Sequence, residues 1–113
     1  MDKTLTKLRI ESIINHIEYI ENDLQDMSLE EFEKSDLHVR GTCFSLMQIG
    51  EQLSKLQDIF GKEYPDIPWK EAIKLRTLIV HVYNKVDAEE IYKIAKNDLS
   101  SLKKSIKTIR LID

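Results

Sequence analysis

Apolar residues recur at alternating spacings of three and four along the first quarter of the chain, which predicts an amphipathic helix from about Thr4 to Met27. The apolar stripe consists of Ile10, Ile13, Ile17, Ile20, Leu24 and Met27. Most other positions of this segment are polar or charged. The stripe therefore has to be covered, and either the rest of a helical bundle or a second copy of the chain can cover it.

Capping residues predict where the next two helices begin. The sequence Ser-Leu-Glu-Glu at positions 28–31 has the spacing of a capping box and starts a short helix. Ser35 or Asp36 can then cap a long helix that reaches about Phe60, with Gly61 at its C-terminal end. The packed side of the long helix is predicted to contain Leu37, Phe44, Met47, Leu53, Leu56 and Phe60.

Several residues of this long helix do not follow a simple apolar pattern. Gly41 and Gly50 each cost up to about 1 kcal/mol relative to alanine inside a helix, and we expect the close approach of another helix to compensate at both positions. Cys43 fits a small core residue. Glu51 places a carboxylate beside Gly50, where it either serves a site or an interface or simply faces solvent.

The second half of the chain predicts two more helices. Both prolines of the chain lie in the break between Tyr64 and Pro68, after which a helix begins near Trp69. Asp87 starts the last helix, whose apolar face consists of Ile91, Ile94, Ala95, Leu99, Leu102, Ile106 and Ile109. The whole pattern predicts an all-α fold: an antiparallel bundle of four main helices and one short helix, in a single domain spanning residues 1–113.

Composition supports a soluble helical protein, since 33% of the 113 residues are charged and only three are glycine. The single cysteine excludes an intrachain disulfide and a cysteine-based zinc cluster. Asp36 and His38 are two residues apart, so they point in different directions on a helix, and we expect no metal site there. No apolar run is long enough to span a membrane and no signal-peptide core is recognisable, so we expect a cytoplasmic protein.

The charge is distributed unevenly between the two halves of the chain. Residues 1–61 contain 6 Lys and Arg against 12 Asp and Glu, a balance of −6, whereas residues 62–113 contain 11 against 8, a balance of +3. Local charge steers anions more than total charge does. The second half is therefore the better candidate for binding an anionic ligand, although solvated helix faces explain much of the difference.

The eight residues Arg-Thr-Leu-Ile-Val-His-Val-Tyr at positions 76–83 place an arginine, a histidine and a tyrosine in a run that is otherwise almost all apolar. Burying polar groups without partners is costly, so these residues either face a polar seam or a second subunit, or form a site. Arg76 has a fork that matches phosphate, and His81 titrates near neutral pH. On a continuous helix Tyr83 lies within about 20° of Arg76, but His81 lies about 140° away. Either the helix ends near His81 or a second chain completes the site.

The spacing of Arg76, His81 and Tyr83 resembles the signature of the HepT toxins, minimal HEPN-domain ribonucleases that are paired with a MntA-type nucleotidyltransferase antitoxin. The resemblance runs from about Leu37 to Leu102. It also rests on Ile49-Gly50-Glu51, on Pro65-Asp66-Ile67-Pro68-Trp69 and on Asn84-Lys85-Val86-Asp87.

The resemblance implies a HEPN-like fold and a metal-independent endoribonuclease toxin of a type VII-like toxin–antitoxin pair. It implies an RNA substrate, a homodimer with the site at its interface, and no cofactor. Arg76 and His81 would be catalytic, and Tyr83 would bind the RNA phosphate or be the tyrosine that the antitoxin modifies with AMP.

One position departs from the family pattern. Family members usually have asparagine or another polar group able to contact the site directly after the arginine, where this chain has Thr77, which is a weaker candidate for contacting RNA. The departure supports an alternative, a non-catalytic HEPN-like helical binding or scaffold partner of a nucleotidyltransferase. A third reading, a purely structural dimerising bundle, leaves the polar residues of the 76–83 segment unexplained.

Overall fold

The computed structural model describes residues 2–82 and 87–111, and for residues 77–82 it describes the backbone alone. Within these ranges all regular elements are helices, which confirms the predicted all-α fold. The helices are α1 (Lys3–Leu24), α2 (Leu29–Lys34), α3 (Asp36–Phe60), α4 (Trp69–Val82), α5 (Ala88–Asn97) and α6 (Leu99–Ile106).

The predicted last helix is divided into α5 and α6 at Asp98. This residue has φ −104° and ψ −23°, which departs from ideal helical geometry. The backbone hydrogen bonds continue across it, because Asp98 N donates to Ile94 O at 3.1 Å and Leu102 N donates to Asp98 O at 3.3 Å. The division is therefore a local irregularity, and the apolar face runs through it without a break.

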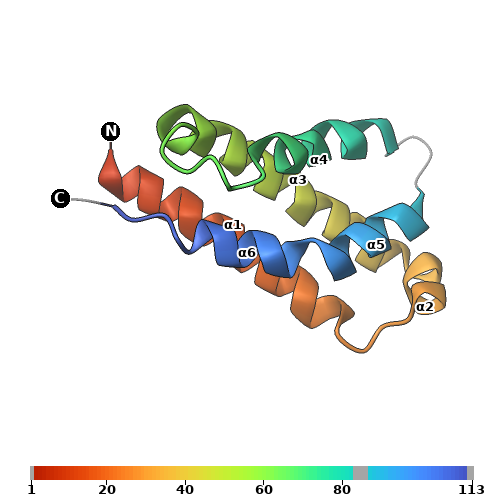
Figure 1. Cartoon of the computed structure of the whole chain (residues 1–113). Helices are drawn as coiled ribbons and strands as arrows, with labels where there is room; N and C mark the ends of the chain where they lie inside the picture. Colours follow the sequence, from red (N-terminus) through yellow and green to blue (C-terminus); the bar gives the residue numbers. More distant parts are fainter. Residues whose placement is uncertain (1, 83–86, 112–113) are drawn as a thin grey trace.

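Helix α3 is the central element of the bundle, packing against α1 on one side and against α4 on the other (Figure 1). Helices α5 and α6 cover α1 and the core. On α1 the residues Ile13, Ile17, Ile20 and Leu24 are at most 2% exposed. The central part of the apolar stripe of α1 is thus covered by the chain itself and not by a second copy.

Side chains of α5 bind the C-terminal end of α1 and the residues just beyond it. Lys96 Nζ donates to Leu24 O at 2.5 Å, and the Tyr92 hydroxyl donates to Met27 O at 2.6 Å. These bonds join residues of the last third of the chain to the carbonyl groups at and just beyond the end of the first helix. They fix α5 against α1 and thereby close the bundle.

The predicted caps are confirmed by their hydrogen bonds. Ser28 and Glu31 form the capping box of α2, with Glu31 N donating to Ser28 Oγ at 3.1 Å and Ser28 N donating to Glu31 Oε1 at 3.0 Å. Ser35 caps α3 by accepting from His38 N at 3.3 Å. Asp36 instead forms an ion pair with Arg40 at 2.8 Å. Asp36 and His38 therefore have separate partners.

Two expectations for α3 are wrong. A Cβ added at Gly41 would have nothing within 4 Å, so no helix of the described chain approaches this glycine. Leu37 and Phe44, predicted to be packed, are 72% and 57% exposed. The buried side of α3 instead follows Val39, Cys43, Leu46, Ile49, Leu53, Leu56 and Phe60. Helix α3 thus carries apolar residues on two sides, and the chain buries one of them.

No helix in the described ranges has both the length and the apolar composition that crossing a membrane requires.

Candidate active site between α3 and α4

Gly50 determines how closely α4 approaches α3. A Cβ added at this residue would lie 3.1 Å from Arg76 Cβ, 3.2 Å from Arg76 N and 3.6 Å from Ala72 O. Even the Cβ of an alanine at position 50 would require α4 to shift by a few tenths of an ångström, so glycine permits the observed approach. The close approach expected at Gly50 is confirmed. The side chain of Arg76 therefore leaves the α4 backbone next to α3.

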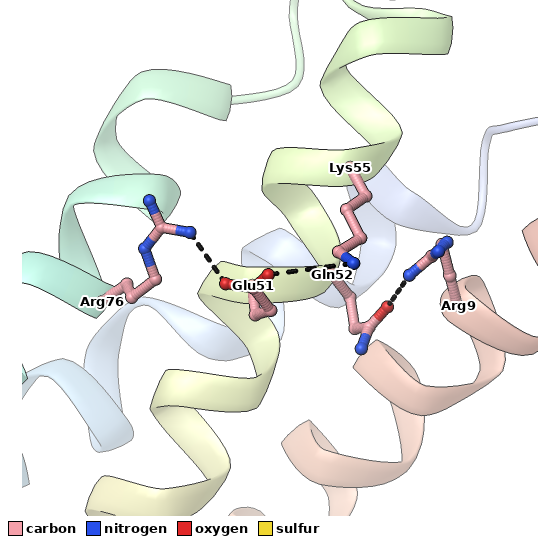
Figure 2. A network of polar contacts seen from close by, with 5 residues as sticks. All are labelled: Arg9, Glu51, Gln52, Lys55 and Arg76. Atoms are coloured by element: carbon pink, nitrogen blue, oxygen red, sulfur yellow. Dashed lines mark hydrogen bonds and ion pairs between the residues drawn. The ribbon is translucent and has the colours of Figure 1, made fainter.

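Arg76 pairs with Glu51, the residue that follows Gly50. Arg76 Nη1 donates to Glu51 Oε2 at 2.7 Å, and the two side chains are 42% and 41% exposed (Figure 2). The stem of the arginine therefore packs between the helices while its charged head reaches the surface. Glu51, whose role the sequence left open, contacts the arginine of the motif. This hydrogen bond uses one of the five guanidinium donors.

Cations surround the Glu51 carboxylate. The hydrogen bond from Arg76 contributes most to lowering the pKa of Glu51 below its ordinary value, and the charges of Arg76, Lys55 and Arg9 lower this pKa further. Partial desolvation raises the pKa but is outweighed. Lys55 Nζ lies 4.0 Å from Glu51 Oε1. The carboxylate is therefore ionised at neutral pH and orients the guanidinium.

Arg9 approaches the same region from α1. Its Nη1 donates to the side-chain oxygen of Gln52 at 2.9 Å (Figure 2). Consecutive residues of α3, Glu51 and Gln52, thus hold arginines of the two flanking helices. Neither Arg9 nor Lys55 was predicted from the sequence as a site residue. Lys55 could have been found because it follows Glu51 by four residues on a helix, whereas the Arg9 contact depends on tertiary packing.

The remaining residues of the motif are placed only by the backbone. Thr77 and His81 lie inside α4, which continues to Val82, so the helix does not unwind before His81. The Cα positions of residues 76 and 81 are consequently about 140° apart around the axis of α4. Arg76 faces α3, and His81 stands on another side of the same helix. Tyr83 lies outside the described residues, and its role stays a prediction.

Other features described in the chain do not suit phosphate chemistry. A hollow of about 460 Å³ lies between α4 and the α5–α6 segment, but its described lining includes the carboxylates of Glu71 and Asp98 and no basic side chain. Cys43 is 2% exposed, and burial raises the pKa of its thiol, as fits a core residue. The side chains around Glu51, by contrast, bring Arg76 and Lys55 to one carboxylate and Arg9 to the neighbouring Gln52.

Comparison with known proteins agrees on one family. A family model described as "Ribonuclease HepT-like" matches residues 13–109. The chain is 30% identical over 105 residues to a "Probable ribonuclease HepT" of Thermococcus cleftensis, which covers 89% of this chain and 92% of that protein. It is 29% identical over 113 residues to a "Putative RNase" of Methanocaldococcus jannaschii, covering 96% and 93% of the two chains. No solved structure gives a significant match.

Proposed function

The chain belongs to the HepT-like ribonuclease family, and we propose that it is a cytoplasmic, metal-independent endoribonuclease, the toxin of a type VII-like toxin–antitoxin pair. The observation that carries the proposal is the Arg76 guanidinium, which α3 holds at the surface through Glu51 at 2.7 Å. An oriented, permanently charged fork at the surface is suited to a phosphodiester. The family match supports RNA cleavage as the reaction, and the geometry around Arg76 supports this residue as its phosphate-binding group.

The cleavage chemistry needs few groups. The ribose 2′-hydroxyl attacks the adjacent phosphorus when a base removes its proton, and an acid protonates the leaving 5′-oxygen. His81 is suited to either role, because the pKa of an imidazole lies near neutral pH. Arg76 stabilises the charge that builds up on the phosphoryl oxygens. Two copies of His81 in a dimer can supply both the base and the acid.

A homodimer resolves the geometric problem of the motif, since the positions of Arg76 and His81 diverge on one α4. The exposed large hydrophobic residues of the described chain all lie on α1 and α3, namely Leu5, Leu8, Tyr19, Leu37, Phe44 and Ile59. On α3, Leu37, Phe44 and Glu51 follow one another at spacings of seven, which places them on one side of the helix. A second copy that covers Leu37 and Phe44 therefore lies beside the Arg76–Glu51 pair.

Activity is tested with purified protein and RNA in excess EDTA. Wild type should cleave, whereas His81→Ala and Arg76→Ala should not, with helicity by circular dichroism unchanged. Equal cleavage by all three proteins would indicate a contaminating nuclease and refute the proposal. The alternative, a non-catalytic binding or scaffold partner that Thr77 favours, predicts no cleavage by any of them and stable binding to a nucleotidyltransferase.

The dimer is tested by light scattering. Wild type should be a dimer, and Phe44→Glu should yield a folded monomer that has lost cleavage, because a charge on the covered side opposes association. A wild-type monomer that cleaves RNA would contradict the dimeric site.

We further propose that a MntA-type nucleotidyltransferase antitoxin silences the toxin by attaching AMP to Tyr83. Seven residues after Arg76, the tyrosine would share a helix face with the guanidinium if the helix continues, and an anionic adduct there would occupy the phosphate site. Co-expression should add AMP to the peptide that contains Tyr83 and reduce cleavage in parallel, and Tyr83→Phe should escape. Modification of Tyr64 or Tyr92 instead, as read by mass spectrometry, would refute this control mechanism.

A further inference from the structure

Three helices each contribute one cation to the surroundings of Glu51. Arg9 comes from α1, Lys55 from α3 and Arg76 from α4 (Figure 2). Arg9 and Lys55 belong to the half of the chain that is otherwise acidic, with 6 basic against 12 acidic residues in positions 1–61. Their position next to the motif arginine is therefore not a consequence of a generally basic surface.

The charge of this cluster is not balanced. Arg76 Nη1 lies 2.7 Å and Lys55 Nζ lies 4.0 Å from the Glu51 carboxylate, and Arg9 binds the neighbouring Gln52, so three cations gather around one carboxylate. Lys55 Nζ is 4.0 Å from the carboxylate, too far for a hydrogen bond. Arg9 is held by Gln52, whose neutral amide oxygen orients the guanidinium without compensating its charge.

Ion pairs elsewhere in the described chain differ from this arrangement. Arg40 pairs with Asp36 at 2.8 Å, and Lys93 pairs with Glu89 at 3.2 Å, so each of these cations has a carboxylate of its own. Isolated pairs of this exposed kind contribute little and leave no excess charge. An oriented cluster with excess positive charge is instead the usual arrangement for contacting several phosphates.

We propose that Arg9, Lys55 and Arg76 form one binding site for the phosphate backbone of single-stranded RNA, extending across α1, α3 and α4. Arg76 contacts the phosphate that is cleaved, while Arg9 and Lys55 contact phosphates of neighbouring nucleotides. Glu51 and Gln52 are positioning residues that aim the two guanidinium groups. The proposal rests on the proposed function, and it adds two RNA-binding residues that lie outside the motif.

Binding is measured by fluorescence anisotropy of a labelled, unstructured RNA oligonucleotide, in a His81→Ala background so that the RNA stays intact. Arg9→Gln and Lys55→Gln are compared with the matched variants Arg40→Gln and Lys93→Gln. Each of the first two should weaken binding and reduce the slope of log K against log salt by about 0.7, the value for one phosphate contact on a single strand. The matched variants should leave both quantities unchanged.

Two further variants separate a binding role from a structural one. Lys55→Glu should weaken binding more than Lys55→Gln, because it reverses the charge. Glu51→Gln keeps an oxygen that accepts from Arg76 and removes the negative charge, so it should tighten binding. In protein with His81 intact, Arg9→Gln and Lys55→Gln should raise KM and leave kcat nearly unchanged.

The outcomes distinguish this site from the catalytic proposal. If Arg9→Gln and Lys55→Gln bind RNA with the same affinity and salt slope as Arg40→Gln and Lys93→Gln, the extended site is refuted even when wild type cleaves. If wild type binds with the expected salt dependence but never cleaves, the nuclease proposal fails and the binding site stands. Weakened binding in all four variants alike would mean that general charge drives binding, which also refutes the site.

Discussion

Two glycines on one helix provide a controlled test of the contact between α3 and α4. Gly50→Ala and Gly41→Ala both place alanine inside α3, so both gain about 1 kcal/mol of helix propensity. At Gly41 the new Cβ has nothing within 4 Å, and the full gain should appear as increased stability. At Gly50 the new Cβ would lie 3.1 Å from Arg76 Cβ and 3.2 Å from Arg76 N. These atoms cannot rotate away, so α4 must shift by a few tenths of an ångström.

Comparing the stabilities of the two variants cancels the gain in helix propensity, because both substitutions contribute it. Overpacking a close contact costs about 1–3 kcal/mol, which at Gly50 offsets or exceeds the propensity gain. Gly50→Ala should therefore be between about neutral and 2 kcal/mol less stable than wild type, and about 1–3 kcal/mol less stable than Gly41→Ala. Urea unfolding followed by far-ultraviolet circular dichroism measures both values.

Cleavage gives the second measurement. Gly50→Ala displaces Arg76 and should reduce the cleavage rate, whereas Gly41→Ala should leave the orientation of Arg76 unchanged. If Gly50→Ala stabilises the protein as much as Gly41→Ala does, the helices do not meet at Gly50 in solution. Gly50 would then not be the residue that brings the motif arginine against α3.

Further predictions concern single side chains. The pKa of Glu51 is lowered from its ordinary value of 4.5, mainly by the hydrogen bond from Arg76. The ionised carboxylate therefore stabilises the fold fully above pH 4.5, and this stabilisation is lost as the pH falls through the lowered pKa. The stability difference between wild type and Glu51→Gln, measured by urea unfolding, should accordingly shrink in acid; a constant difference would contradict the pairing. Cys43 should react with a thiol reagent only on unfolding, because it is buried with a raised pKa, and rapid labelling of native protein would disprove its burial. Ser28→Ala should cost about 1 kcal/mol of stability in thermal unfolding, through loss of the cap of α2, and an unchanged midpoint would count against the capping box.

The features that local sequence determines were predicted well. The cap at Ser28, the start of α4 at Trp69 and the apolar stripe of α1 each depend on residues within one or two turns of one another. Gly41 was misjudged because the propensity cost of glycine is the same whether or not a neighbouring helix lies beside it. Phe44 was misjudged because helix α3 is apolar on two sides, and periodicity does not tell which side the bundle covers.

The environment of the candidate site could be predicted only in part. The motif marked Arg76, but its partner Glu51 lies 25 residues away, and their contact depends on how α3 and α4 are rotated about their axes. The contact of Arg9 with Gln52 joins residues 43 positions apart, and no local pattern encodes it. The motif residues lie in one segment, so the sequence reveals them. The charged residues around Arg76 come from other helices and are brought together only by tertiary packing.

The bonds that α5 makes to the end of α1 have a consequence for the order in which the bundle opens. Tyr92 and Lys96 reach Met27 O and Leu24 O over separations of 65 and 72 residues. Until α5 has docked, Leu24 O has its local bond from Met27 N at 3.2 Å, whereas Met27 O depends on water. The α3–α4 hairpin closes a much shorter loop and has its own close contact at Gly50. Native-state hydrogen exchange should therefore show α5 and the last turn of α1 exchanging together as one cooperative unit, while the amides of α3 around Gly50 remain protected through that opening.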